Sequence, residues 1–288
     1  MVAALVSVFA LVLTLSVSTA RAASPSVGAF SGLGTWVDVF DYTPRLQANG
    51  APPPFVAASV DDLAPLGVRT LYLQVANPDG APATALTDAK LIKAILARAS
   101  HDDIKVVAWY LPSLVDLTRD TAMIRRIAAL PFDGLGLDIE ATDVADVPTR
   151  NARTVTLARR TRALLGNGRP VAAIVYPAIQ LEFLNPVLWP DFPYRRVEPF
   201  VDVWMPMAYY TFRSGTLRNA YTYSVENVKL LRTRVGSDVP VHIVGGIADL
   251  STTTDNIDLR RAARTTKAIG WSVYDYVTTS SAAWPYLG

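Results

Sequence analysis

Strand-like apolar runs alternate with helix-like segments eight times along this 288-residue chain, and this alternation constrains the fold more than any other feature. The runs are rich in Val, Ile, Leu and aromatic residues, as is typical of buried strands. They lie at Thr35–Asp41, Arg69–Ala76, Lys105–Leu111, Gly134–Ile139, Pro170–Tyr176, Val201–Tyr209, Pro240–Gly246 and Gly270–Tyr276. Regular alternation indicates parallel strands joined by crossover helices. Eight such units predict a single-domain α/β fold, the (β/α)8 TIM barrel, which takes about 250 residues.

The first 22 residues have the composition of a cleaved export signal. Residues 2–17 are almost entirely apolar, and Ala20-Arg21-Ala22 matches the small-x-small rule for signal cleavage. The apolar run is shorter than the roughly 20 residues that a spanning helix needs. We therefore expect cleavage between Ala22 and Ala23, a secreted monomer without a stable membrane anchor, and a mature domain covering 23–288. An uncleaved anchor is the alternative.

Composition argues against several classes of function. Cysteine is absent, so disulfides, thiol catalysis and cysteine–zinc sites are excluded. The two histidines, His101 and His242, are far apart in the sequence, and His242 is expected to be structural because it begins a strand. The formal net charge is only +2 and the charged residues are scattered, which gives no basic stripe for nucleic acid. No Gly-x-Gly-x-x-Gly follows the first strand. We expect no metal, no organic cofactor and no nucleic-acid partner.

The fourth predicted strand carries two acidic residues on one face. Side chains alternate along a strand, so Asp138 and Glu140 share the face opposite to Leu135, Leu137 and Ile139. The apolar face suits packing against helices, which turns the acids into the barrel at its C-terminal end, where active sites lie. Two carboxylates about 7 Å apart at Cα raise one pKa, so one member can stay protonated as a general acid. Gly136, on the same face, is expected to leave room for a ligand ring.

Other strand ends supply aromatic and polar residues suited to binding sugars, which present flat C–H faces and many hydroxyls. On the first strand, alternation sends Trp36, Asp38 and Phe40 inward, and Asp38 is either a second carboxylate partner or a buried structural acid. Asp41 and Asp275 also fall at strand ends. Each aromatic residue is either a sugar platform or a packing residue of the core. The predicted substrate-binding residues are Asp38, Gln74, Trp109, Tyr176, Tyr209 and Tyr274.

Two of these motifs resemble a known family. The segment 132–140, Phe-Asp-Gly-Leu-Gly-Leu-Asp-Ile-Glu, resembles the DGxDxDxE signature of family 18 glycoside hydrolases, the chitinase family, with Gly136 in place of the middle aspartate. Met207-Ala208-Tyr209 resembles that family's Met-x-Tyr-Asp, with Tyr210 in place of the aspartate. The third strand lacks the family's Ser-x-Gly-Gly.

The resemblance implies a glycosidase acting on a polysaccharide or glycan. By the same resemblance, Glu140 would protonate the glycosidic oxygen, and Asp138 would orient Glu140 or steady an N-acetyl group of the substrate. Two alternatives stay open. One is a catalytically inactive barrel that binds carbohydrate in the same cleft, favoured by the two replaced aspartates. The other is a barrel hydrolase or lyase that uses the acids on a different substrate.

Overall fold

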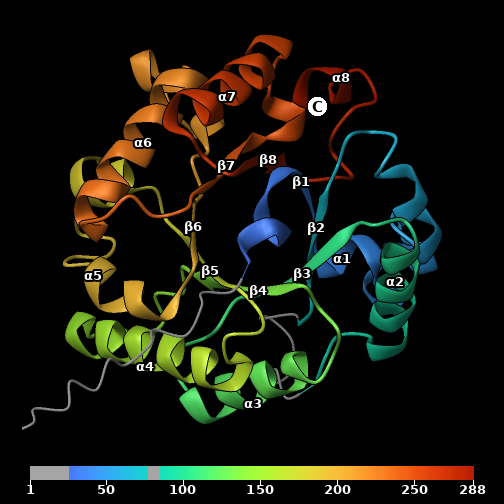
Figure 1. Cartoon of the computed structure of the whole chain (residues 1–288), viewed down its shortest axis with the longest axis horizontal. Helices are drawn as coiled ribbons and strands as arrows, with labels where there is room; N and C mark the ends of the chain where they lie inside the picture. Colours follow the sequence, from blue (N-terminus) through green and yellow to red (C-terminus); the bar gives the residue numbers. More distant parts are fainter. Residues whose placement is uncertain (1–25, 77–84) are drawn as a thin grey trace, which may run out of the picture.

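Eight parallel strands form a barrel in which each strand pairs with its neighbours in sequence (Figure 1). The computed structural model describes residues 26–76 and 85–288, so the predicted export signal lies outside the described residues. The strands are β1 (Gly32–Val37), β2 (Thr70–Gln74), β3 (Lys105–Tyr110), β4 (Gly134–Ile139), β5 (Val171–Val175), β6 (Val203–Pro206), β7 (His242–Ile247) and β8 (Gly270–Tyr274). Parallel bridges from Trp204 to Val241 and from Met207 to Val244 join β6 to β7 and complete the ring. The predicted TIM barrel is confirmed.

Helices surround this ring (Figure 1). They are α1 (Val39–Tyr42), α2 (Ala89–His101), α3 (Leu117–Ala128), α4 (Val147–Leu165), α5 (Tyr194–Val197), α6 (Ala220–Val235), α7 (Thr253–Thr266) and α8 (Trp284–Leu287). Each of the five long helices begins at a side chain that accepts a backbone N–H, supplied by Asp88, Asp116, Asp146, Asn219 and Thr252. None of the helices in the described part of the chain combines the length and apolar character needed to cross a bilayer.

The core is divided by the barrel wall. One cluster lies between the strands and the helices and includes Leu135, Leu137 and Ile139 of β4. The other fills the barrel interior and includes Trp36 and Trp109. The predicted alternation on β4 is therefore correct.

The first strand ends earlier than predicted. Asp38 is the N-cap of α1, where its carboxylate accepts the N–H groups of Phe40 and Asp41 at 2.7 and 3.2 Å. Because this cap starts a helix, Phe40 lies on α1 with 49% of its surface exposed. The expectation that Phe40 points into the barrel as a strand residue was wrong.

A short 3-10 helix, Val27–Phe30, seals the N-terminal end of the barrel. It is the blue turn inside the ring in Figure 1. The carbonyl of Phe30 accepts a hydrogen bond from Nδ1 of His242 at 2.9 Å. With the single proton of the neutral ring on Nδ1, Nε2 accepts a hydrogen bond from Ser272 Oγ at 3.0 Å. The same Ser272 oxygen accepts from Trp36 Nε1 at 2.9 Å. Burial lowers the pKa of His242 to about 4, so this histidine is neutral and structural.

Two glycines make room for the side chains that close the N-terminal end of the barrel. A Cβ on Gly270 would lie 2.3 Å from His242 Nδ1, and one on Gly34 would lie 2.5 Å from the ring of Tyr72. Neither position accepts a larger side chain without displacing these rings, since real Cβ atoms do not approach that closely.

We predict that Phe30→Ala destabilises the protein by roughly 3–5 kcal/mol, the usual cost of truncating a buried phenylalanine, because Phe30 is fully buried. Phe183→Ala is the matched control: Phe183 is 68% exposed and should change stability by no more than about 0.5 kcal/mol. Denaturant unfolding measures both. Equal effects of the two substitutions would show that the segment 27–30 does not seal the barrel.

Candidate active site

Asp138 and Glu140 lie at the C-terminal end of β4, where the sequence placed them. Asp138 is a strand residue with 5% of its surface exposed, and Glu140 follows the last residue of the strand. The phenol of Tyr176, which follows β5, donates a hydrogen bond to the backbone carbonyl of Glu140 at 3.2 Å. That bond ties the chain beyond β4 to the neighbouring strand and holds Glu140 at the rim.

The environment of this pair favours the protonated carboxyl form. Burial raises the pKa of Asp138 well above its usual value, and the charge of Glu140 raises it further. Burial also raises the pKa of Glu140. One oxygen of Asp138, Oδ1, is buried without a hydrogen-bond partner among the described residues. Two neighbouring carboxyls in such surroundings retain a proton at a pH where free carboxyls have lost theirs, as a general acid requires.

Gly136 does not leave room for a ligand, contrary to the expectation from sequence. A Cβ at this position would lie 2.8 Å from Cδ1 of Ile174, which projects from β5 into the barrel interior. The space beside Gly136 is thus filled by protein. Asp138 consequently lies above an apolar layer instead of a second aspartate, which adds to its desolvation.

Two of the predicted substrate-binding residues are buried in the protein. Trp109 is 6% exposed and packs edge-on against Trp36, with ring centroids 5.7 Å apart. Gln74 is 5% exposed, and its Oε1 accepts the N–H of Val39 at 3.0 Å, which fixes the start of α1. Both positions favour a packing role over direct contact with a ligand.

The predicted tyrosines are half-buried around the C-terminal mouth of the barrel. Burial raises the pKa of Tyr209, as do the charges of Asp138, Glu140 and Asp275. Tyr209 therefore lies within electrostatic range of acids on both β4 and the chain after β8. Its ring contacts that of Phe212, with centroids 6.0 Å apart, and Phe212 is 59% exposed. Sequence reasoning missed Phe212, which follows the end of β6 without any motif of its own.

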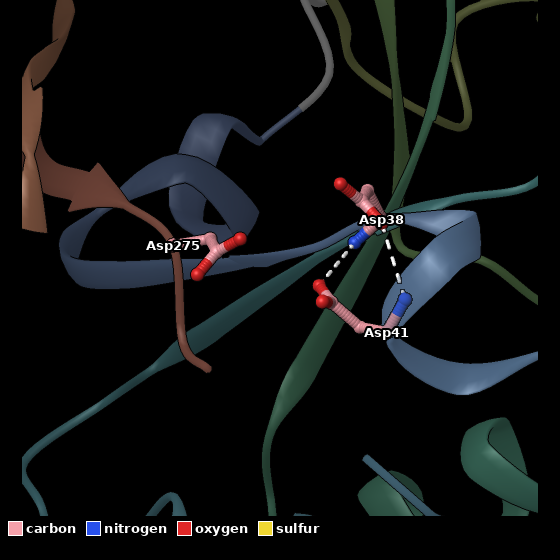
Figure 2. A group of neighbouring side chains, drawn as sticks. All are labelled: Asp38, Asp41 and Asp275. Atoms are coloured by element: carbon pink, nitrogen blue, oxygen red, sulfur yellow. Dashed lines mark hydrogen bonds between the residues drawn. The ribbon is translucent and has the colours of Figure 1, made fainter. Parts of the chain in front are cut away.

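A second group of carboxylates gathers across β1 and β8 (Figure 2). Asp38 and Asp41 come from the first turn of α1, and Asp275 comes from the chain just after β8. One carboxylate oxygen from each of the three residues lies within 4.8 Å of the other two. The hydroxyl of Tyr274 donates to Asp38 Oδ2 at 2.9 Å. Asp38 and Tyr274 were predicted to lie in the site, whereas Asp41 and Asp275 were placed only at strand ends, because nothing in the sequence shows that these strand ends meet.

The three carboxylates are held by hydrogen bonds within the protein. Asp41 Oδ2 accepts the N–H of Asp38 at 2.9 Å, and Asp275 Oδ1 accepts the N–H of Thr278 at 2.9 Å. Oxygen ligands at this spacing are the type that Ca²⁺ or Mg²⁺ takes, but these hydrogen bonds already hold the cluster together. That the protein works without a metal stays a prediction.

Asp41 has the most unusual acidity of the three. Its pKa is raised to about 7, chiefly by burial and then by the charge of Asp38, with a smaller contribution from Asp275. A carboxyl of this kind is half-protonated near neutral pH and can both donate and accept a proton. The mouth of the barrel thus holds two groups of carboxyls that include members with raised pKa values: Asp138 and Glu140 on β4, and Asp41 and Asp275 beside β1 and β8.

No protein-family model matches this chain, and none of the curated proteins matches it. Several solved structures are similar to it. The spore cortex-lytic enzyme SleL from Bacillus megaterium is 9% identical, with a TM-score of 0.62 over 89% of this chain and 73% of that one. A chitinase from Bacteroides thetaiotaomicron is 11% identical, with a TM-score of 0.62 over 90% and 95%. The chitinase-like agglutinin from Robinia pseudoacacia is 13% identical, with a TM-score of 0.59 over 88% and 99%. These similarities show the fold: the chain is a (β/α)8 barrel, and the solved structures that it resembles include chitinases.

We predict that Asp41→Asn stabilises the protein above neutral pH. The folded-state pKa of about 7 lies above the ordinary value of 3.8, so the folded protein binds the proton more tightly and loses stability as pH rises through this window. Asparagine cannot ionise, and its oxygen can still accept the N–H of Asp38. The gain should be near zero at pH 4 and reach at most about 4 kcal/mol at pH 8.

Thermal melts across this pH range measure the effect. Asp249→Asn, at an exposed aspartate, is the control and should leave the melting temperature nearly unchanged throughout. A gain from Asp41→Asn that is the same at pH 4 and pH 8 would contradict the raised pKa.

Proposed function

We propose that this protein is a glycoside hydrolase that cleaves glycosidic bonds of a polysaccharide or glycan, with Glu140 as the general acid. The observation that carries the proposal is the Asp138/Glu140 pair. It lies at the C-terminal rim of β4 with raised pKa values, in a barrel whose structural neighbours include chitinases. Active sites of TIM barrels lie at this end, and glycoside hydrolysis needs a carboxyl that keeps its proton near neutral pH.

In this mechanism Glu140 gives its proton to the leaving glycosidic oxygen, since it is the less buried member of the pair. Asp138, as a carboxylate, stabilises the positive charge that develops on the sugar. The water consumed in the reaction supplies the hydroxyl group to the sugar and the proton that restores Glu140 to its protonated form. Glycoside hydrolysis also needs a second carboxylate, as nucleophile or base. Asp138 is one source, and the group formed by Asp38, Asp41 and Asp275 is the other.

The second candidate function is binding of carbohydrate without hydrolysis. Three observations favour it. The position of the family's middle aspartate is Gly136, and Ile174 occupies the neighbouring space. Tyr210, at the position of the other missing aspartate, is fully buried, and its hydroxyl lies 3.3 Å from Ser251 Oγ, so it supplies no acid to the mouth. One of the structural neighbours is named as an agglutinin.

We predict that Glu140→Gln lowers turnover of an unactivated glycan by about 10²–10⁴-fold, the usual contribution of general acid catalysis. Binding should persist, because the amide keeps the size of the carboxyl. Cleavage of an aryl glycoside with an acidic phenol should fall much less, since that leaving group needs little protonation. Steady-state kinetics on the two substrates measure the difference.

Asp133→Asn is the matched control for this experiment. Asp133 lies at the opposite end of β4, where its Oδ2 accepts the N–H of Val106 at 2.8 Å. It should leave the ratio of the two turnover rates unchanged. Wild-type hydrolysis that Glu140→Gln does not alter would refute the mechanism. Binding of glycans without any wild-type hydrolysis would support the second candidate function instead.

The role of Asp138 is tested by the pH profile of kcat/KM. The proton on the pair is held more tightly because two carboxylates repel each other. Asp138→Asn removes one of these charges, so the alkaline limb of the profile should move to lower pH, together with a loss in rate. An unchanged alkaline limb would show that Asp138 does not influence the acid.

We also propose that the chain is exported and cleaved between Ala22 and Ala23. The apolar run at 2–17 and the Ala-Arg-Ala sequence that follows support this proposal. N-terminal sequencing of protein recovered from the medium should begin at Ala23. Recovery of a chain that still begins at Met1 would refute it.

A further inference from the structure

Arg150, on α4, is a buried cation without a carboxylate partner. Only 3% of its surface is exposed, and among the described residues it forms no ion pair with an acid. Burial lowers the pKa of its guanidinium, yet an arginine keeps its charge in a protein. The cost of burying an unpaired charge is offset here by contacts to backbone carbonyls and to an aromatic ring.

Those contacts join two loops at the mouth of the barrel. Arg150 Nη1 donates to the carbonyl of Thr142, between β4 and α4, at 3.4 Å. Arg150 Nη2 donates to the carbonyl of Leu188, between β5 and α5, at 3.1 Å. The guanidinium also lies 4.3 Å from the ring centre of Trp189. Both loops follow the C-terminal ends of their strands, where TIM-barrel active sites lie, and the planar fork of one arginine links them.

The loop after β5 is a rigid partner for this link. Trp189 is fully buried, and its ring packs edge-on against Phe192 with centroids 5.2 Å apart. Its Nε1 donates to Asn151 Oδ1 at 2.6 Å, and Asn151 Nδ2 donates to the carbonyl of Asp191 at 3.0 Å. Asn151 follows Arg150 on α4. The loop after β5 is therefore fixed to α4 by a buried network, and Arg150 extends this network to the loop after β4.

The segment that carries Glu140 has few anchors of its own. It covers residues 140–145, between the end of β4 and the N-cap of α4. In the described parts of the chain, two side chains hydrogen-bond to it: Tyr176 reaches the carbonyl of Glu140, and Arg150 reaches that of Thr142. Loss of one of these two anchors should therefore loosen the segment.

We propose that Arg150 is a positioning residue for the general acid, because it holds the segment 140–145 against the loop after β5 and so fixes Glu140 at the rim. The inference rests on the proposed function, in which Glu140 is the acid. Proton transfer needs the carboxyl within hydrogen-bond reach of the glycosidic oxygen, and a misplacement of about 1 Å can lower the rate by about 10²-fold. Arg150 touches no substrate in this role and acts through the backbone of the segment.

Arg150→Met tests this role, because methionine is apolar and donates no hydrogen bond. Turnover of an unactivated glycan should fall by roughly 10- to 100-fold. Cleavage of an aryl glycoside with an acidic phenol should fall much less, since that leaving group needs little help from Glu140. Steady-state kinetics give the ratio of the two rates. Equal losses on both substrates would show a merely structural role and overturn the proposal.

Arg150→Lys keeps the charge but replaces the two-pronged donor with a single ammonium. The ratio of the two rates should therefore lie between those of the wild type and Arg150→Met. This milder variant decides the question alone if Arg150→Met does not fold, and a wild-type ratio in Arg150→Lys would then count against the positioning role.

Arg153→Met is the matched control. Arg153 lies one turn further along α4, and its Nη1 donates to the carbonyls of Leu114 and Val115, after β3, at 2.9 and 3.0 Å. It holds a loop that does not carry Glu140. Its loss should leave the ratio of the two rates at the wild-type value, whatever it does to stability.

Limited proteolysis of the full chain tests the link without any reaction. With proteinase K and mass mapping of the products, cleavage within 140–145 should be at least about tenfold faster in Arg150→Met than in the wild type, and unchanged in Arg153→Met. Equal cleavage of this segment in the wild type and Arg150→Met overturns the proposal. If the wild type cleaves no glycan, the proposed hydrolase activity fails, and the proteolysis alone decides whether Arg150 holds the segment.

Discussion

The interior of the barrel has to be filled by side chains, and the rest of the structure depends on how that is done. A closed ring of eight strands leaves a space just wide enough for side chains. Here aromatic rings fill much of it: Trp36 stacks on Tyr72 with centroids 4.4 Å apart, and Trp109 meets Trp36 edge-on. At the N-terminal end of the barrel, the buried His242 links β7, β8 and the N-terminal segment through hydrogen bonds. The interior cluster also includes Val107, Ile174 and Met205, so the layer below the mouth is largely apolar.

The chemistry of the mouth follows from that apolar filling. Asp138 stands above Ile174 and its neighbours without a partner for Oδ1, so its carboxyl is desolvated from below and repelled by Glu140 from above. Asp41, on α1 beyond the end of β1, is also desolvated by burial, and the charges of Asp38 and Asp275 raise its pKa further. Evolution could have neutralised these sites with arginines. Instead the protein keeps four acids, Asp138, Glu140, Asp41 and Asp275, whose raised pKa values mean that their ionisation costs stability. Such acids are common where a fold supports catalysis.

The same geometry explains why hydrolysis and sugar binding are the two candidate functions. Either function could use the barrel, the position of Glu140 at the rim and the half-buried tyrosines. What separates them is proton transfer, because binding needs shape and hydrogen bonds whereas cleavage needs a carboxyl that releases a proton in the transition state.

The sequence by itself determined the barrel and the face of β4 that carries the acids. Strand–helix alternation and the two-residue period of side chains are local properties, and spacing along the chain records them. Tertiary structure decided the rest. Ile174 fills the space that Gly136 leaves, Trp109 is buried in the interior, and Tyr274 reaches Asp38 across 236 positions of sequence. Such contacts depend on the stagger of the strands when the ring closes, and no local pattern specifies where two distant strand ends will meet.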